Sequence, residues 1–560
     1  MDAQKSKADL SEKIPDWVLV GYMACLTVAY LLISGRRFFN FDEFQVMYAS
    51  AAIIRKGSLY SEEIGSHFPL TNLVMSLPGR LVGFHAVVLV ISRYIILALN
   101  CIMLLFAYRI GSLLYNRKAA FLAVCMVVSS FVFLEKGIEI RHDVFNTLFI
   151  VMGIYYGLMF LDRRRNIDLA ASILCLGMAV ASTQKAFVMA AGFVLGLAIY
   201  LIYERDYKSI GKMLLGYFFL APIPLVACLL ILAGLGNDSF DAFLRHSVGN
   251  VIAIFAPLTE ELYPFPYKRL ELFKTLFVAN PLFYIFGISA IVSIMSAARE
   301  RRSKRVIIAI CTAVGLAFYV TAKRPFFQTL LPVIPLLAII GGGLLSNIWH
   351  TLGKWRPIPR SIVGIICFCL LFALPLPSIL KRADEDKRFK KALDNAAFCV
   401  ENLDKKDKVL CFTQNQIFFD PLMKMRNEEC GERIYDFDAD CFERKMIQFQ
   451  CRVIINDYRT QLLSQEIKSR IDENYLWAKT GDIFIPGFKV PPEEVVSKNI
   501  WIRGSYYSPI HSLDIDGERI GEQIVSLEKG IHTFHNQTDR PVTLVYVFDP
   551  ISLKSHLESL

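Results

Sequence analysis

Two adjacent carboxylates, Asp42 and Glu43, stand in the first polar stretch after the first long apolar run, Trp17 to Ile33. The residues that follow, as far as Lys56-Gly57, place apolar side chains at helical spacing. Carboxylates in this position lie at a membrane surface, where one of them can act as a general base on a lipid-linked substrate. Asp42 could instead cap the helix that follows, because Asp is a preferred N-cap residue.

Further polar groups recur where later apolar runs end, and their cations are candidates for binding the phosphate of a lipid headgroup. Each of these groups could instead have a purely structural role. A cation at a helix end can extend to the lipid headgroups and anchor the helix there, and neighbouring opposite charges can form a structural ion pair. We favour the ion pair for Glu139. The groups are His67-Phe68-Pro69-Leu70; Glu139, Arg141, His142 and Asp143; Gln184-Lys185; Arg245-His246; and Lys323-Arg324.

The elements that must position these residues are membrane helices. The chain has 560 residues, of which 54% are hydrophobic and 42 are Phe, which is too apolar for a soluble protein of this size. We predict a polytopic membrane protein with about 11 spanning helices, at roughly 16–34, 86–107, 119–134, 144–161, 168–183, 186–203, 213–234, 273–297, 306–321, 326–347 and 361–379. The first run lacks a cleavage site, so we expect it to be retained.

The distribution of positive charge predicts the orientation. If the N-terminus is cytoplasmic, most Lys and Arg of the membrane part fall in inside loops, as the positive-inside rule requires. Every polar group named above then lies on the opposite face, together with everything after residue 380. The first external loop, about 35–85, contains two segments too short to span, 42–56 and 69–82, and we expect both to be interfacial helices.

Taken in order, the motifs resemble a known class of enzymes. The Asp-Glu pair, Gly57-x-x-Tyr60 with His67-Phe68-Pro69-Leu70, the stretch from Arg141 to Phe149, Thr183-Gln184-Lys185-Ala186, and the stretch from Ala322 to Pro332 are similar to motifs of the polyprenyl-phosphate-sugar-dependent glycosyltransferases of the GT-C class. That class includes dolichyl-phosphate-mannose protein mannosyltransferases and bacterial aminoarabinose and lipopolysaccharide-core transferases. The resemblance covers roughly residues 16–380.

The resemblance implies a hexosyl- or pentosyltransferase that moves a sugar from a polyprenyl-phosphate donor to a lipid, glycan or protein acceptor. Such a reaction needs a base for the acceptor hydroxyl and cations for the departing phosphate. We expect Asp42 to be the base, with Glu43 or Asp143 tuning it, and Arg141, Lys185, Lys323 and Arg324 to bind the phosphate. The chain shows no nucleotide-binding motif, which suits a lipid-linked donor, and we expect no nucleic-acid partner.

The resemblance also raises a metal site. In the aminoarabinose transferases a metal is held by a residue just upstream of the Pro of the first-loop motif and by a His of the long external loop, and His67 and His246 occupy similar places here. This sequence has His-Phe-Pro where that branch has Glu-Lys-Pro. The cofactor is therefore either a divalent cation (zinc, magnesium or manganese) or none, in which case both His residues contact the acceptor or form hydrogen bonds.

Beyond residue 380 the composition shifts towards that of a soluble domain. Residues 381–487 alternate short apolar runs with amphipathic stretches and predict an α/β domain, and 488–560 predict a β-sandwich-like subdomain with a hairpin at Asp516-Gly517. A Cys430–Cys441 disulfide is one option among the cysteines of this part. We expect the tail to contact the acceptor or partner proteins, or to form a lid over the membrane site.

The large external domain and the resemblance to bacterial enzymes favour a bacterial inner membrane, with the site and the tail in the periplasm. A transporter or lipid flippase is the competing function, since such proteins also have many helices. Transporters place ionisable residues near the bilayer midplane and often contain internal repeats, whereas these charges collect at helix ends. The sequence leaves open the sugar, the acceptor, the lipid length and the oligomeric state.

Overall fold

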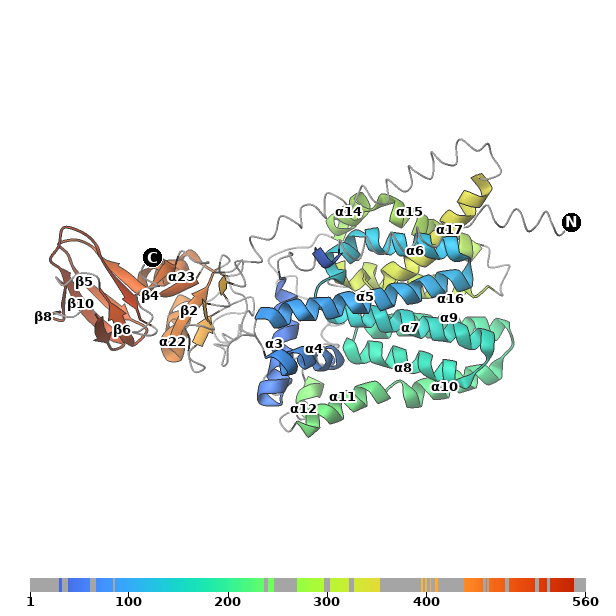
Figure 1. Cartoon of the computed structure of the whole chain (residues 1–560), viewed down its shortest axis with the longest axis horizontal. Helices are drawn as coiled ribbons and strands as arrows, with labels where there is room; N and C mark the ends of the chain where they lie inside the picture. Colours follow the sequence, from blue (N-terminus) through green and yellow to red (C-terminus); the bar gives the residue numbers. More distant parts are fainter. Residues whose placement is uncertain are drawn as a thin grey trace. The chain divides into compact units, whose positions relative to one another are not determined.

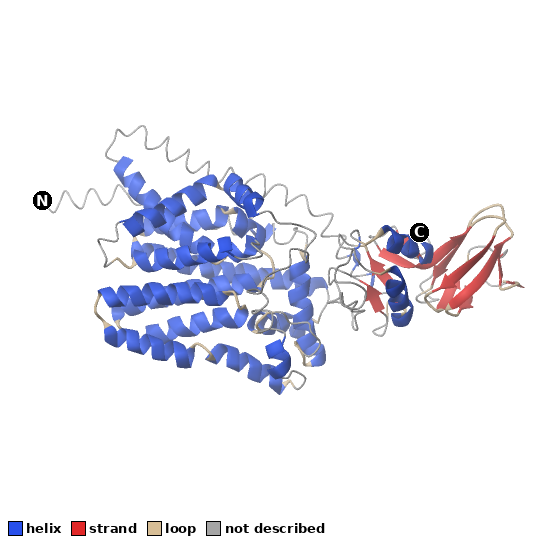
Figure 2. Ribbon diagram, turned by 180° about the vertical axis from the view of Figure 1, so that it is seen from behind, coloured by secondary structure: helices blue, strands red, loops and turns tan. Residues whose placement is uncertain are grey.

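The computed structural model describes residues 30–32, 39–60, 67–83, 86–235, 240–245, 269–296, 303–321, 327–352, 394–395, 398–399, 403, 408–410, 438–456, 460, 463–478, 483–508, 513–520 and 524–547. The chain divides into two compact units. The first holds 30–32 and the described residues of 49–83 and 87–352, and the second holds 39–48, Ala86 and the described residues from 394 onward. Figures 1 and 2 show that the first unit is helical and that the strands belong to the second.

The first unit is a bundle in which most of the long helices lie side by side with their axes roughly aligned (Figure 1). The most extensive pairings join α7 to α8, α9 to α16, and α6 to α17. The elements are α4 (Leu70–Val82), α5 (Ala86–Leu114), α6 (Arg117–Ser129), the π-helix η1 (Phe133–Gly137), α7 (His142–Arg163), α8 (Asn166–Ser182), α9 (Ala186–Tyr203), α10 (Tyr207–Leu220), α11 (Ile223–Gly234), α12 (Phe240–Phe243), α14 (Arg269–Ala279), α15 (Pro281–Ser296), α16 (Arg305–Thr321), the 3₁₀-helix η5 (Phe327–Leu330) and α17 (Val333–Leu352).

Glycine allows α6 and α17 to approach closely. A Cβ atom added to Gly342 would lie 2.6 Å from the carbonyl oxygen of Ala119 and 2.9 Å from the nitrogen of Ala123. Lipid tails are as apolar as leucine side chains, so helices in a bilayer associate through close packing of small residues rather than through the hydrophobic effect. Gly342 and the alanines of α6 therefore supply the contact that holds this pair together.

Composition and exposure agree with a bilayer around the bundle. Within the described residues, four segments are long and apolar enough to cross a membrane: Val87–Leu114, His142–Arg163, Ala186–Tyr203 and Tyr207–Gly234. The last segment, formed by α10 and α11, exposes large apolar side chains, among them Phe218 at 74% and Leu230 at 67%. In water such a surface would be an aggregation site, whereas in lipid it is the expected outer face.

The helices differ from the predicted spans in detail. Every predicted span inside the described residues contains helix, but the count of eleven is not confirmed, because 361–379 and most of 16–34 lie outside them. The span expected at 273–297 is divided between α14 and α15 at Asn280-Pro281, where proline cannot donate the backbone hydrogen bond that a continuous helix needs. Ala221-Pro222 separates α10 from α11 in the same way.

The two short segments of the first loop form helices close to their expected bounds. α3 (Phe41–Lys56) corresponds to 42–56 and α4 to 69–82. The amphipathicity of α4 is the reverse of that of a helix on the surface of a soluble protein. Thr71, Asn72 and Ser76 are buried, while Leu77 and Leu81 are exposed by 54% and 84%. This helix turns a polar face into the bundle and an apolar face outward.

The second unit contains two sheets (Figure 2). One sheet has the order β1-β2-β4-β11-β6-β9, with β3 also paired to β4, and the other has the order β5-β10-β7-β8. β1 and β2 are parallel, and the remaining pairs are antiparallel. The strands are β1 (Lys408–Leu410), β2 (Cys451–Ile455), β3 (Tyr475–Ala478), β4 (Ile483–Val490), β5 (Val495–Ile500), β6 (Gly504–Tyr507), β7 (Leu513–Ile515), β8 (Glu518–Arg519), β9 (Ile524–Leu527), β10 (Gly530–Asn536) and β11 (Val542–Tyr546), and the helices are α22 (Ala439–Phe449) and α23 (Gln465–Asn474).

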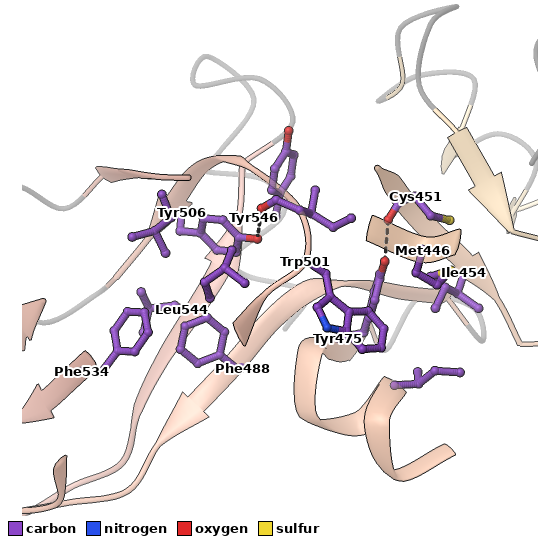
Figure 3. Close-up of a cluster of buried hydrophobic side chains, with 14 of the residues drawn as sticks. Met446, Cys451, Ile454, Tyr475, Phe488, Trp501, Tyr506, Phe534, Leu544 and Tyr546 are labelled. Carbon is purple, nitrogen blue, oxygen red and sulfur yellow. Dashed lines mark hydrogen bonds between the residues drawn. The ribbon is translucent and has the colours of Figure 1, made fainter. Parts of the chain in front are cut away.

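One hydrophobic core serves both sheets (Figure 3). Phe488 of β4 and Phe534 of β10 meet with ring centroids 4.9 Å apart, an edge-to-face contact between the two sheets. The Tyr475 hydroxyl donates to the carbonyl of Cys451 at 2.6 Å, and burial raises the pKa of Tyr475 well above its usual value. The predicted hairpin is confirmed: Ile515 pairs with Glu518, and Asp516 and Gly517 between them both have positive φ.

Two features bear on the expected division of this unit. β4 crosses the boundary expected at 487/488, and its sheet contains strands from both sides of that boundary. Cys441 is disulfide-bonded, while none of the other cysteines that the structure describes forms a disulfide, so the partner of Cys441 lies outside the described residues, as Cys430 does.

Candidate functional site

The adjacent carboxylates Asp42 and Glu43 have different environments in the first turn of α3. The carbonyl of Asn40 accepts from the backbone N–H of Glu43 at 3.0 Å, and the Glu43 side chain accepts in return from the N–H of Asn40 at 3.0 Å. The second of these bonds is the one that the glutamate of a capping box makes, and Glu43 is fully buried. Asp42 therefore is not the N-cap. It lies in the first turn and is partly exposed.

In the first unit, His67 joins three of the polar groups that the sequence singled out. His67 Nδ1 lies 3.2 Å from Oε1 of Gln184, and the rings of His67 and His142 have centroids 4.4 Å apart. The carbonyl of His67 accepts from the Tyr60 hydroxyl at 2.8 Å. The first loop, the start of α7 and the turn between α8 and α9 therefore meet at one end of the bundle, around His67.

Three helices begin at this meeting point, and none has a side-chain cap. α4 follows Pro69, α7 follows Arg141 and α9 follows Lys185, and no side chain at these N-cap positions bonds a backbone N–H of its helix. The first N–H groups of a helix have no partner within the helix, and the macrodipole adds roughly half a positive charge there. At α9 the first N–H groups already bond the carbonyls of Thr183, Gln184 and Lys185, so the ends that favour an anion such as a phosphate, beside the two cationic residues, are those of α4 and α7.

A buried ionic network occupies the segment between η1 and α7. Arg141 Nη1 lies 2.8 Å from Glu139 Oε2, Arg141 Nε lies 3.6 Å from Asp143 Oδ2, and Lys136 Nζ lies 3.0 Å from Glu139 Oε1. Glu139 is fully buried and Arg141 is 5% exposed. This geometry agrees with the structural ion pair that we favour for Glu139 from the sequence. It also means that two carboxylates already bind Arg141, whose charge a phosphate would have to share.

Several buried polar atoms at the same end have no hydrogen-bond partner among the described residues: Thr71 Oγ1, Asn72 Oδ1, His142 Nε2, Asn146 Oδ1 and Thr183 Oγ1. An unsatisfied buried polar group costs about 1–3 kcal/mol, so five together would cost about 5–15 kcal/mol, which equals the whole stability of a typical domain. Water or a polar ligand can supply the missing partners. Arg141 and Lys185 lie close enough to His142, at this end of the bundle, for their positive charges to interact with its imidazole ring.

Aromatic rings fill the position beside His67. Phe68 is 4% exposed and packs on Phe243 with centroids 5.6 Å apart, while Tyr60 meets Phe243 at 5.4 Å. The lysine that the aminoarabinose branch has at this motif position is therefore replaced by a packed apolar side chain. Any cation for a substrate phosphate must come from another segment, such as Lys185.

Sequence reasoning missed Arg93. Its side chain is 1% exposed although it lies inside α5, a membrane-spanning segment. Two turns further along α5, Asn100 donates to the carbonyl of Gly137 at 2.6 Å, which fixes α5 against η1. An arginine within a span is rare and marks a functional site by default. The signal was available in the sequence as the single charged residue between 86 and 107.

Three predicted site residues, His246, Lys323 and Arg324, lie outside the described residues. Within the described part, no group of three or more His, Cys, Asp or Glu side chains could hold a metal ion. His67 instead pairs with His142 and Gln184. Two imidazoles in ring contact and an amide oxygen do not by themselves form a zinc site, which takes at least three protein ligands.

Comparison with known proteins confirms the resemblance. The family described as dolichyl-phosphate-mannose-protein mannosyltransferase matches residues 66–231. No curated protein sequence matches the chain. The crystal structure of ArnT from Cupriavidus metallidurans in the apo state is 14% identical, covers 80% of this chain and 94% of its own, and has a TM-score of 0.57.

The same ArnT bound to undecaprenyl phosphate covers 95% of this chain and 98% of its own, at 11% identity and a TM-score of 0.56. The Archaeoglobus fulgidus oligosaccharyltransferase in its apo form is 13% identical, covers 83% of this chain and 74% of its own, and has a TM-score of 0.51. At these identities the likeness shows the fold. The chain therefore has the GT-C fold, a helical membrane unit followed by a region with sheets.

Proposed function

We propose that this protein is an integral-membrane glycosyltransferase, hexosyl or pentosyl, that moves a sugar from a polyprenyl-phosphate donor to an acceptor outside the cytoplasm. The observation that carries the proposal is the meeting of two helix N-termini without a side-chain cap, those of α4 and α7, with Arg141 and Lys185 around His67, at one end of a GT-C membrane bundle. An anion site at the end of a membrane bundle fits a phosphate whose lipid chain remains in the bilayer. ArnT binds undecaprenyl phosphate, and the archaeal oligosaccharyltransferase AglB binds a dolichol-phosphate.

Lys185 is the best placed cation for the donor phosphate. It is the N-cap residue of α9, beside Gln184, and its charge adds to that of the helix end. Arg141 contributes second, because Glu139 and Asp143 share it. Lys323 and Arg324 complete the proposed set. Together these groups would stabilise the charge that develops on the phosphate as its bond to the sugar breaks.

Asp42 is the proposed base. It would take the proton from the acceptor hydroxyl while that oxygen bonds to the anomeric carbon, and the donor phosphate would leave with the electron pair of the broken bond. Glu43 is a poorer candidate, because its carboxylate is buried in the capping box of α3. Asp143 would help to position Arg141, which lies 3.6 Å away.

A divalent cation remains part of the proposal only through His67 and His246. The Archaeoglobus oligosaccharyltransferase was crystallised with zinc and sulfate. In this chain His67 Nδ1 faces Gln184, so His67 could offer only its other nitrogen to a metal.

The disulfide at Cys441 supports an extracytoplasmic tail, since disulfides persist in oxidising compartments. We therefore place the N-terminus in the cytoplasm and the tail in the periplasm of a bacterial inner membrane, as the positive-inside pattern suggests. In that compartment the tail would contact the acceptor, which is an envelope glycolipid, an oligosaccharide or a protein.

The test uses cells that lack the protein, complemented with wild type, Asp42→Asn or Glu43→Gln. Mass spectrometry then compares their envelope glycolipids and glycoproteins, with protein abundance measured in parallel. We expect a glycoform one sugar heavier with wild type, its loss with Asp42→Asn, and its retention with Glu43→Gln, because a glutamine oxygen can still accept the capping hydrogen bond.

Full activity of Asp42→Asn would remove Asp42 as the base. If no glycoform differs in any strain, the transferase proposal fails and a transporter or flippase becomes the better account. Loss of activity in Glu43→Gln at normal abundance would show that Glu43 does more than cap α3.

A further inference from the structure

The chain interrupts its helix between α6 and η1, and a side chain from another segment supplies the missing hydrogen bonds. Ser130 has extended backbone (φ −72°, ψ 135°), so α6 ends at Ser129 and a new helical turn begins at Phe131. In a continuous helix the Ser129 carbonyl and the Phe131 N–H would each bond a residue four positions away. Here Nδ2 of Asn280 donates to the Ser129 carbonyl at 3.1 Å, and Oδ1 of Asn280 accepts from the Phe131 N–H.

Asn280 itself stands at an interruption, because it separates α14 from α15, which begins at Pro281. Its side chain is 7% exposed, and 149 positions in the chain separate it from Phe131. A broken helix in a bilayer needs neighbours that satisfy its freed backbone groups, and one amide does this here for two groups at once. Transporters place interrupted helices at their substrate sites. Two interruptions that bond each other therefore suggest a role beyond packing.

A second asparagine holds the other end of η1. Asn100 of α5 is 5% exposed, and its Nδ2 donates to the carbonyl of Gly137, the last residue of η1, at 2.6 Å. The π-helix is a rare form that is found frequently at functional sites. Asn280 and Asn100 thus fix the start and the end of the segment 131–137 from two different parts of the bundle.

This segment is joined to Arg141 by ionic contacts. Lys136 belongs to η1 and lies 3.0 Å from Glu139, and Glu139 lies 2.8 Å from Arg141. Because Glu139 is fully buried and bonded to a cation on either side, a shift of η1 would displace Glu139 and, with it, the guanidinium of Arg141. The two asparagines therefore control the position of a cation that belongs to the proposed phosphate site.

We infer that Asn100 and Asn280 are positioning residues for the donor phosphate, which hold η1 so that Arg141 stays at the phosphate site. The inference rests on the proposed function, because it concerns how that same site is kept in place. Neither amide touches the phosphate, and each acts through η1. Stabilisation of a departing phosphate requires charges that are in place before the bond breaks, and a misplacement of about 1 Å can cost about a hundredfold in rate.

The test measures the affinity of the purified full-length protein for polyprenyl phosphate in detergent, together with its thermal unfolding. Asn280→Leu and Asn100→Leu each keep a side chain of similar size and remove the hydrogen bonds to the segment 131–137. We expect each to weaken binding by about tenfold or more, since Arg141 is displaced. The double variant should bind about as weakly as the weaker single variant, because both act through η1. Asn280→Leu combined with Lys185→Gln should instead show the product of the two single losses.

Asn116→Leu is the matched control, at the opposite end of α6. The Asn116 side chain accepts from the N–H of Ala119 at 2.8 Å and donates to Oγ of Ser346 on α17 at 3.2 Å, so this variant also removes two hydrogen bonds. We expect it to lower the unfolding temperature and to leave the affinity for polyprenyl phosphate unchanged.

Wild-type affinity in Asn280→Leu and Asn100→Leu would overturn the inference and leave the proposed function in place. Losses that multiply in the double variant would also overturn it, because the two amides would then act separately. Failure of the wild-type protein to bind polyprenyl phosphate would overturn both proposals. Asn100→Leu leaves only the Gly137 carbonyl without its partner, so it provides the test if Asn280→Leu does not fold.

Discussion

Glu139→Gln should destabilise the protein far more than its conservative chemistry suggests. Glu139 is fully buried and accepts from Arg141 at 2.8 Å and from Lys136 at 3.0 Å. The amide keeps the shape but removes the charge, so Arg141 and Lys136, both largely buried, lose the carboxylate that they share. Removing one partner of a buried pair costs about 3–5 kcal/mol, and we expect the lower end of that range because the glutamine oxygen still accepts.

The matched control is Asp241→Asn, the same carboxylate-to-amide change in a pair with Arg245 whose two side chains are 77% and 70% exposed. Exposed pairs contribute about 0–1 kcal/mol, so thermal unfolding in detergent should barely change. The double variant Glu139→Gln with Lys136→Met should recover part of the loss, because one uncompensated cation is then gone. If Glu139→Gln unfolds at the same temperature as Asp241→Asn, the network does not stabilise this segment and our reasoning is wrong.

Three further outcomes test the fold. Cys441→Ser should lower the stability of the second unit by about 2–5 kcal/mol, seen as faster limited proteolysis, and reductant should reproduce the effect in wild type but not in the variant. Gly342→Leu should abolish stable expression because its Cβ would lie 2.6 Å from the Ala119 oxygen, whereas Gly211→Leu, with nothing within 4 Å, should be tolerated. Burial raises the pKa of Tyr475, so this group stabilises the fold fully below its unfolded value of 10.0 and loses that contribution as the pH rises above it; tyrosinate absorbance should appear together with loss of strand circular dichroism.

Local sequence patterns predicted local structure well. The spacing of apolar residues located α3 and α4 to within a residue or two, and Asp516-Gly517 predicted a two-residue hairpin, because both signals come from residues close together in the chain. The predicted spans that contain Asn280-Pro281 and Ala221-Pro222 were read as continuous. Hydropathy measures only how apolar a segment is. It does not show that a proline within the segment lacks the backbone N–H that a continuous helix needs, although both prolines stand in the sequence.

Long-range pairing was beyond the sequence. The sequence placed His67, His142 and Gln184 on one face, but it offered no reason for His67 to contact His142, since residues 75 positions apart become neighbours only through tertiary packing. Asp42 and Glu43 are adjacent in the sequence, and the sequence does not say which of the two carboxylates accepts the hydrogen bond from the N–H of Asn40. In the structure it is Glu43. Thr71, Asn72, Asn146 and Thr183 drew no attention, because their burial without partners is a property of the folded bundle.

The inverted amphipathicity of α4 explains how such a site can serve a lipid-linked substrate. A helix at a bilayer edge that presents Leu77 and Leu81 outward is compatible with lipid tails, and its inner face of Thr71, Asn72 and Ser76 is compatible with a sugar phosphate. A donor molecule has the same two halves in the same order, an apolar chain joined to a polar headgroup. A helix with the usual polarity would bury leucines against the headgroup and expose threonine and asparagine to lipid, and both contacts would be unfavourable. The buried polar side chains of α4 are therefore compatible both with a bundle surrounded by lipid and with the proposed substrate.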